Sequence, residues 1–573
     1  MLFLGVFNSS SSSYSDKEIS ELRKAISRDP DAQVETVKCA GFVLVTVNDE
    51  TFGRSTNLRI SESSIGLMLG RPYLETLVDS DVDALFNSLL SEDRNYEQLA
   101  NSRGSFCSVV FDRERSVLRL CTDKVGVYPV YIARVGDRIY FSSALRMLQS
   151  IEGVCGALDL EGVFCKIAYG YSLGTQTTYV NVERMYGGEV NEFSVDGVDR
   201  SRYWSWDDVN PLDVDYSVLK TQLFNAFIEA VGLRIEGSAG DLSFLSGGLD
   251  SRCIVGALTV LNRPVWSLNF APQGCQDQLF GEIVAKALGA KHFQTSQANG
   301  SLPERQKGIL ERWAEQNSQV ISTGLNPFRV WSGDGGSVGL GHVYLDRQFI
   351  NLLRNDRLEE AVQYFLDKEK IAFPSRMLVN SYRKQSDIAP KANLMSELES
   401  FKCVDRGKAG FLFLLMNDQR QHLSNYFEDL DIHRFEMVLP FFDAKFLELI
   451  VAAPLDLFLS HVFYNDWLSC FPDGVGQVPW QAYPTHEPCP LPMNQYKELR
   501  YQWTDDWFDE ADKKARRNKS MKIWRGLIFK RRFSRHLVRL EVLVIAYLLT
   551  RLGVSNYDYL LNAAVEIDAM MPD

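Results

Sequence analysis

Residues 242–252, LSFLSGGLDSR, combine side chains and spacing that suit a phosphate-binding turn. An apolar run ends at Leu245, and an apolar helix pattern resumes at Ile254. A strand–loop–helix turn with two glycines leaves backbone N–H groups at a helix N-terminus, where the helix dipole favours an anion. The two serines add hydroxyl donors. We therefore predict that a nucleotide phosphate contacts Leu245, Ser246, Gly247, Gly248, Leu249, Asp250 and Ser251.

Asp250 indicates that a metal ion takes part in this turn. A carboxylate repels a bare phosphate, so its presence implies Mg²⁺ between the two groups. The turn is not the loop of Walker-type nucleotidases, because no Lys follows the glycines. The sequence thus predicts a magnesium–nucleotide site with Asp250 as a metal ligand.

Length and composition are those of a globular protein with more than one domain. The 573 residues exceed what one core organises, and 45% are hydrophobic and 24% charged. A net charge of −13 argues against specific nucleic-acid binding. Ten cysteines without a CxxC pair, together with a start that lacks a basic region, favour a reducing cytoplasmic setting. No segment reaches about 18 consecutive apolar residues, so we expect no membrane span.

The first domain, residues 1–205, has the pattern of a layered β domain with a few helices. Short apolar runs separated by turn residues recur along it. The predicted strands are Leu2–Phe7, Phe42–Val47, Phe106–Phe111, Val117–Cys121, Val127–Ala133 and Arg138–Phe141.

The second domain, residues 206–573, alternates helices and strands. A helix over Val218–Val231 precedes the strand Leu242–Leu245, and a second strand, Val265–Phe270, precedes a helix over Asp277–Leu288. This order predicts a parallel, doubly wound sheet whose ligands bind at the carboxyl ends of the strands. Asn269 and Phe270 end the second strand, so we predict that they contact the nucleotide.

A second glycine-rich turn, VWSGDGGSVGLG, covers Val330–Gly341. Gly333 and Gly335 flank Asp334 and give the turn freedom to aim its carboxylate. We expect the two glycines at the nucleotide and Asp334 in a catalytic or metal-binding role. Beyond this turn, the chain has a mostly helical pattern.

Five regions in order, the first of them residues 104–143, resemble the asparagine synthetase superfamily. In the first domain, GSFCSVVFD, TDKVGVYPVY and YFSSALRML fit the family's N-terminal domain. In the second, the SGGLDS turn, Asp277–His292, Ser332–Gly341 and Glu436–Asp443 fit its synthetase domain. The resemblance implies an Ntn-hydrolase-like layered domain followed by an ATP-pyrophosphatase domain with a helical extension, and it implies ATP and Mg²⁺ as cofactors.

The chain departs from the family at the start of the first domain. Glutamine-hydrolysing members begin Met-Cys, and the cysteine is the nucleophile, whereas position 2 here is Leu. The family's glutamine-holding stretch is not visible, and the nearest candidate for it is LGRPY at Leu69–Tyr73. The resemblance therefore predicts a glutaminase-like domain that has lost its chemistry, as in β-lactam synthetases and lasso-peptide cyclases.

The synthetase motifs depart as well. In the family register, the metal-binding aspartate falls at Ser337, and Val338 replaces the acid that follows it. Asp334 either supplies the missing oxygen or the site lacks one ligand. In EMVLPFFD, Val438 replaces the usual Arg while Glu436 remains, and the resemblance implies that Glu436 helps deprotonate an attacking amine. Its alternative role is an ion pair with His433 or Arg434.

A basic segment, residues 513–539, stands out in this acidic protein, with Trp524, Leu527, Ile528 and Phe529 among its cations. We expect either a solvated helix or an amphipathic helix that binds a membrane surface, an acidic partner or a carrier. Leu540–Leu549 is too short to span a bilayer and is expected to be a core helix.

These patterns predict an ATP-dependent ligase that activates a carboxylate as its adenylate and forms an amide. The carboxylate belongs to a small molecule or a peptide, and the nitrogen comes from ammonia or from a substrate amine. One alternative is an intramolecular cyclase of the β-lactam synthetase or lasso-peptide type that acts on a precursor. Another is a non-catalytic ATP-binding or scaffold protein.

Overall fold

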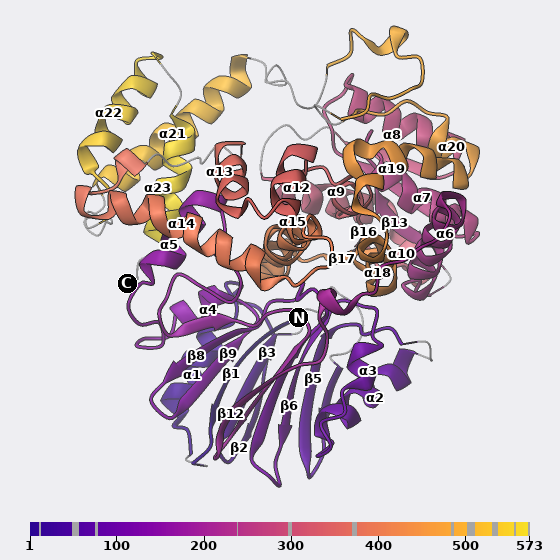
Figure 1. Ribbon diagram of the computed structural model, residues 1–573. Helices are drawn as coiled ribbons and strands as arrows, with labels where there is room; N and C mark the ends of the chain where they lie inside the picture. The colour runs from indigo at the N-terminus through magenta and orange to yellow at the C-terminus, as the bar shows by residue number, and fades with distance from the viewer. Residues whose placement is uncertain are drawn as a thin grey trace.

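The structure is a computed structural model that describes residues 1–10, 13–47, 57–74, 78–237, 239–295, 301–368, 375–482, 486–500, 510–529, 537–554 and 557–570. Antiparallel sheets of the N-terminal domain form one half of the molecule, and the helix-rich C-terminal domain forms the other (Figure 1). Across the described ranges, no helix has both the length and the apolar character needed to cross a bilayer.

Two six-stranded antiparallel sheets make up the N-terminal domain. The first has the order β10-β8-β9-β1-β3-β2, and its strands are Val182–Arg184, Tyr131–Val135, Arg138–Ser142, Leu2–Asn8, Phe42–Val47 and Val34–Cys39. The second has the order β12-β11-β7-β6-β5-β4, and its strands are Gly197–Arg202, Glu189–Ser194, Val117–Thr122, Phe106–Asp112, Ser64–Gly70 and Asn57–Ile60.

The two sheets face each other across a shared apolar core. Phe42 of β3 stacks on Phe111 of β6 with ring centroids 4.5 Å apart, and Phe7 of β1 lies 5.9 Å from the same ring. The predicted layered β domain is thus present, and all six predicted strands overlap observed ones. The helices beside the sheets are α1 (Asp16–Ala25), α2 (Val78–Leu90), α3 (Glu97–Ala100), α4 (Leu145–Gln149) and α5 (Leu160–Tyr169).

The predicted domain boundary at 205/206 falls between β12 and α6 (Tyr216–Leu233). After it the chain builds a five-stranded parallel sheet with the order β15-β14-β13-β16-β17. Its strands are Lys291–Gln294, Val265–Asn269, Asp241–Phe244, Arg329–Trp331 and Glu436–Val438.

The strand order reverses between β13 and β16. From β13 the chain moves outward through β14 and β15, then returns to the other side of β13 with β16 and β17. Such a reversal opens a crevice at the carboxyl ends of the two central strands, where open α/β sheets bind ligands. The turns after β13 and β16 are the two glycine-rich turns singled out by the sequence.

Helices surround the parallel sheet and continue to the end of the chain. Those nearest the sheet are α7 (Asp250–Val260), α8 (Gln276–Ala287), α9 (Leu302–Gln316), α10 (Ser318–Ile321), α11 (Gly336–Gly341), α18 (Ala444–Ala452), α19 (Val462–Trp467) and α20 (Asp473–Gly476). The others before residue 500 are α12 (Arg347–Arg354), α13 (Leu358–Lys368), α14 (Asn380–Ser400), α15 (Lys408–Phe413), α16 (Arg420–Glu428) and α17 (Leu430–His433).

The basic segment belongs to a C-terminal group of three helices, α21 (Glu510–Phe529), α22 (Leu540–Arg551) and α23 (Asp558–Met570). Trp524 and Leu527 of α21 are buried in a small core shared with α22, α23 and α5. These side chains therefore pack on the protein itself, while residues 530–536 of the segment lie outside the described ranges. α22 covers the predicted core helix and buries Leu543.

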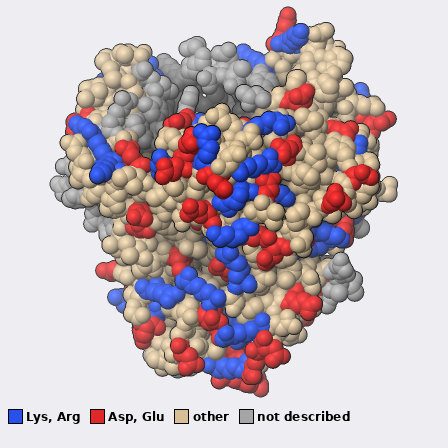
Figure 2. All heavy atoms as spheres, in the orientation of Figure 1, with Lys and Arg blue, Asp and Glu red and all other residues tan. Residues whose placement is uncertain are grey.

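Figure 2 shows Lys and Arg interspersed with Asp and Glu on the face drawn.

Candidate functional site

A cavity of about 530 Å³ lies at the carboxyl ends of β13 and β16, where the strand order reverses. The turn after β13 and the turn after β16 both line it. Side chains of the π-helical segment Leu414–Gln419 and of α16 complete another part of the wall. The cavity is thus bounded by segments far apart in the sequence that the parallel sheet brings together.

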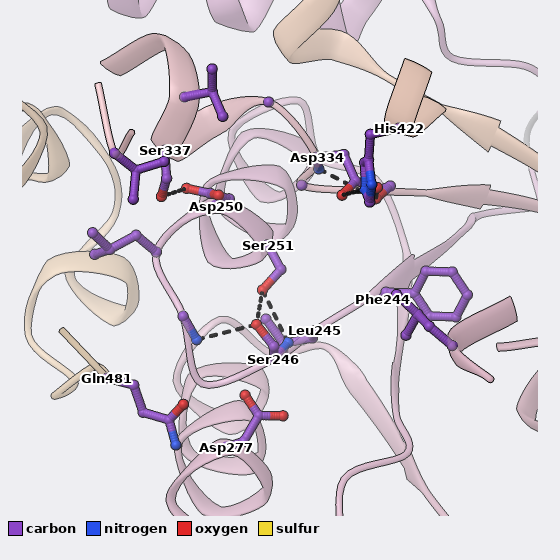
Figure 3. A pocket seen from close by; sticks show the side chains of 18 of the residues that line it. Phe244, Leu245, Ser246, Asp250, Ser251, Asp277, Asp334, Ser337, His422 and Gln481 are labelled. Carbon is purple, nitrogen blue, oxygen red and sulfur yellow. Dashed lines mark hydrogen bonds and ion pairs between the residues drawn. The ribbon is translucent and has the colours of Figure 1, made fainter. Parts of the chain in front are cut away.

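The Ser246–Ser251 turn is ordered by its own side chains (Figure 3). The Ser246 N–H donates to Oγ of Ser251 at 3.0 Å, and the Gly248 N–H donates to Oγ of Ser246 at 3.2 Å. Helix α7 starts at Asp250, so the N–H groups of its first turn have no partner within the helix. Gly247 is required sterically, because a Cβ there would lie 2.8 Å from Cα of Asp277. This arrangement directs a helix N-terminus at the cavity.

Arg252 fixes the turn from behind. Its guanidinium donates to the carbonyls of Gly247 and Gly248 at 3.1 and 2.9 Å. It also donates to the carbonyls of Val475, Val478 and Pro479, which ties the turn to the segment after α20. The side chain is fully buried, and burial lowers its pKa to about 10. Because both glycine carbonyls are engaged, the turn has little freedom to rotate its peptide planes.

The carboxylate of Asp250 accepts two hydroxyl donors, Ser337 and Tyr464, both at 2.8 Å from Oδ1. Gly336 makes room for it, since a Cβ there would lie 2.7 Å from Cγ of Asp250. Burial raises the pKa of Asp250 to about 6, the two hydroxyls oppose that rise, and the charge of Asp334 adds to it. A nearby positive charge would therefore stabilise Asp250 in its ionised form.

Asp334 has a separate set of partners. Its Oδ2 accepts the Ser332 hydroxyl at 2.7 Å, and Nε2 of His422 lies 3.9 Å from its Oδ1 (Figure 3). Burial acts to raise the pKa of Asp334, but His422 and Ser332 together lower it below its ordinary value. Asp334 in turn raises the pKa of His422. The two groups thus stabilise each other as an ion pair.

Two further polar groups lie near the glycines of the turn. Oδ1 of Asp277 accepts the Gly247 N–H at 2.8 Å, and burial raises the pKa of this carboxyl to about 6. Gln481 is only 6% exposed, and neither end of its side-chain amide has a hydrogen-bond partner among the described residues. A buried amide without partners costs stability, and a bound ligand with a donor and an acceptor would recover it.

The structure brings nearly all of the predicted site residues to this one cavity. Gly247 forms the wall behind it, through its bonds to Asp277 and Arg252. Glu436 starts β17 and accepts the Tyr128 hydroxyl at 3.3 Å, so it is not brought together with the others. Those that line the cavity are Leu245, Ser246, Gly248, Leu249, Asp250, Ser251, Asn269, Phe270, Gly333, Asp334 and Gly335.

Sequence reasoning missed one residue behind the lining and several residues of the lining itself. Tyr464, whose hydroxyl holds Asp250, lies more than two hundred positions away in α19, and no local pattern links the two. Asp277 was noted only as the start of a family helix. The other missed residues come mostly from the helices and include Gln306, Asp418, His422, Tyr426, His461 and Gln481.

The cavity is acidic. Asp250, Asp277, Asp334 and Asp418 all line it, and none of the described lining residues is a Lys or an Arg. A bound nucleotide would therefore depend on backbone N–H groups, the dipole of α7 and metal ions for neutralisation.

The residues present fit Mg²⁺ at Asp250. A buried carboxylate and hydroxyl oxygens are hard ligands of the kind Mg²⁺ prefers, and it completes its shell with water and phosphate oxygens. Within the described part of the chain, no cluster of three or more His, Cys, Asp or Glu could hold a metal by itself.

Comparisons with known proteins agree with the sequence motifs. The profile of the glutamine amidotransferase domain matches residues 75–204. The chain is 24% identical over 219 residues to glutamine-hydrolysing asparagine synthetase 1 of Bacillus subtilis. This alignment covers 38% of this chain and 34% of that protein. It is 23% identical over 189 residues to a putative asparagine synthetase 2 of Methanocaldococcus jannaschii, with coverages of 32% and 36%.

The matched region spans about a third of the length of these curated relatives. Among solved structures, the glutamine PRPP amidotransferase of B. subtilis, complexed with ADP and GMP, is similar at 10% identity with a TM-score of 0.23. That similarity covers 58% of this chain and 81% of the other. The domain match and the curated relatives support a relationship of this chain to the asparagine synthetase superfamily.

Proposed function

We propose that this protein is an ATP-dependent ligase that forms an amide from a carboxylate and an amine. The observation that carries the proposal is the Ser246–Ser251 turn. It sits at the reversal of the strand order, it directs the N-terminus of α7 at the cavity, and Arg252 holds it rigidly from behind. This combination suits a pyrophosphate leaving group.

The proposed reaction has two steps. A carboxylate oxygen of the substrate attacks the α-phosphorus of ATP, the P–O bond to the β-phosphate breaks, and pyrophosphate leaves. The amine nitrogen then attacks the acyl carbon, the C–O bond to AMP breaks, and the amine gives up one proton to solvent. The N–H groups of the turn and of the first turn of α7 would stabilise the charge that develops on pyrophosphate.

Asp250 is the residue that would hold Mg²⁺, with the Ser337 hydroxyl beside it. The ion would supply positive charge to the phosphates, which no described Lys or Arg of the cavity lining does. Both carboxylate oxygens of Asp334 already have partners, the Ser332 hydroxyl and the His422 ring. We therefore leave Asp334 out of the proposed metal ligands. Glu436 is left out of the proposed proton transfer because Tyr128 holds it away from the cavity lining.

The N-terminal domain is proposed not to hydrolyse glutamine. Leu2 opens β1, pairs with Val47 of β3 and is 1% exposed. An isobutyl side chain buried in a sheet cannot act as a nucleophile. The amine would therefore come from free ammonia, from another enzyme or from the substrate itself.

The test is carboxylate-dependent exchange of labelled pyrophosphate into ATP, with a panel of amino acids, small carboxylic acids and peptides. We expect exchange with at least one class of carboxylate and none without Mg²⁺. No exchange with any of them, together with no binding of ATP, would contradict the proposal.

A second candidate is a protein that binds ATP without turning it over. The neutral Ser337 at the family's metal position and the acidic, cation-free lining favour it. ATP binding without exchange on the full panel would select this candidate. An intramolecular cyclase would instead show exchange only with a substrate that carries both the carboxylate and the amine.

A further inference from the structure

One wall of the cavity is built on an irregular helix. Residues Leu414–Gln419 wind with π-helical geometry between α15 and α16, and such segments are rare and frequent at functional sites. Asn417 anchors the segment by accepting the Gly174 N–H of the N-terminal domain at 2.7 Å and by donating to Glu397 at 3.1 Å.

The helix presents one polar face to the cavity. Asp418, His422 and Tyr426 are spaced four residues apart, so they share a side of the helix, and all three line the cavity. His422 pairs with Asp334 of the β16 turn at 3.9 Å, which brings a second carboxylate to the same wall (Figure 3). We call Gln306, Asp334, Asp418, His422 and Tyr426 the α16 wall.

The α16 wall has an unused acceptor. Gln306 of α9 is 6% exposed and lines the cavity, and its Oε1 has no hydrogen-bond partner among the described residues. The carboxylates of Asp334 and Asp418 contribute two negative charges, of which His422 offsets at most one. Since no described lining residue is a Lys or an Arg, a cationic donor from outside the chain would both occupy Oε1 of Gln306 and balance this charge.

We propose that the α16 wall is the binding site for the amine substrate, which enters as an ammonium cation and gives up one proton to solvent before its nitrogen attacks the acyl carbon. An ammonium group brings N–H donors for Oε1 of Gln306 and a positive charge for Asp334 and Asp418. The charge of Asp334 is felt at Asp250, so a cation held here lies beside the proposed nucleotide subsite. The inference rests on the proposed function. It specifies that the second substrate of that reaction, the amine, binds in its cationic form.

The test is calorimetric binding to the full chain with ammonium, methylammonium and putrescine chlorides, and with methanol and butanediol as neutral counterparts. We expect at least one amine to bind and the alcohols not to bind. Asp418→Asn, which keeps the volume, should weaken amine binding at least tenfold, and Gln306→Leu should weaken it as well. Asp473→Asn, at an exposed aspartate outside the cavity, should not.

Binding of MgATP, measured on the same samples, separates this proposal from the proposed function. Amine binding without MgATP binding would count against the ligase and leave the amine site standing. No amine binding to the wild type, or equal binding to wild type and Asp418→Asn, would overturn the amine site. Displacement of a bound amine by MgCl₂ alone would make the α16 wall a metal site and overturn it too.

Discussion

The Ser337 hydroxyl donates a 2.8 Å hydrogen bond to Oδ1 of Asp250. In the family register a metal-binding aspartate would stand where Ser337 is, so a neutral donor replaces an anion at this contact. One carboxylate, not two, therefore stands at this contact, and its ionisation sets the local charge. Tyr464 reinforces the arrangement with a second hydrogen bond to the same oxygen.

Asp250→Asn should abolish pyrophosphate exchange and stabilise the unliganded fold. Asp250 is half-buried, and desolvation raises its pKa from 3.8 to about 6, so the folded state prefers the neutral form. Protonation of Asp250 therefore contributes to the free energy of unfolding. This contribution is full below pH 4 and is lost as pH rises through about 6. At pH 7.5 the gain from Asn is about 3 kcal/mol at most. Thermal unfolding without ligands measures it, and the gain should shrink toward pH 4.

Ser337→Ala should shift the acid limb of the exchange rate to higher pH. The hydroxyl stabilises the ionised form of Asp250, so its removal raises the pKa of that carboxyl further. Exchange requires the ionised form and is lost as pH falls through its pKa. Rates measured from pH 5 to 9 at subsaturating Mg²⁺ test this, with Ser322→Ala as a control at an exposed serine. If the acid limb of the rate profile were unchanged in Ser337→Ala, the ionisation that limits exchange would belong to a group other than Asp250.

The sequence predicted the strand–turn–helix geometry around Ser246–Ser251 well because its signal is local. Ser246–Ser251, with its strand before and helix after, appears in the structure as a strand end, a turn and α7 starting at Asp250. The glycine-rich turn after β16 was also recognised from its local glycine pattern, whereas the short strand Arg329–Trp331 was not predicted. Strands β15 and β17 were not predicted, because they are short and their pairing depends on distant segments.

The α16 wall could not be predicted from the spacing of its residues in the sequence. Asp418, His422 and Tyr426 have helical periodicity, which by itself indicates only one side of a helix. The contact of His422 with Asp334, eighty-eight positions earlier in the numbering, comes from packing of α16 against the β16 turn. Glu436 shows the reverse case: its motif matched, but the start of β17 lies at the opposite end of the strand from the cavity.

Arg252→Met should destabilise the protein by about 3–5 kcal/mol, because buried carbonyls that share one guanidinium lose their donor. The affected acceptors are five backbone oxygens, two of them on the Ser246–Ser251 turn. Urea unfolding of the full chain measures the loss. Arg357→Met, which removes an exposed ion pair with Glu360, serves as the comparison and should cost less.

Purified protein given glutamine should release no glutamate above background. Leu2 has no nucleophilic atom, and the buried Cys107 and Cys121 have pKa values raised well above 9 by burial, which keeps them as thiols. A coupled glutamate dehydrogenase assay gives the measurement, with an active glutaminase as the positive control. Glutamate release that persists through repeated purification would show a nucleophile elsewhere in the chain.

Asp334→Asn decides between two roles for this carboxylate. As a magnesium ligand, Asp334 would set the Mg²⁺ concentration at half-maximal exchange, and the variant would need more metal. As part of the α16 wall, it would leave that concentration unchanged and raise the amine concentration at half-maximal amide formation. We expect the second outcome, because Oδ2 accepts the Ser332 hydroxyl and Oδ1 faces His422. Asp250→Glu, which keeps the charge but moves it, is the comparison that should alter the Mg²⁺ requirement. A larger Mg²⁺ requirement in Asp334→Asn, with amine dependence unchanged, would return Asp334 to the metal site.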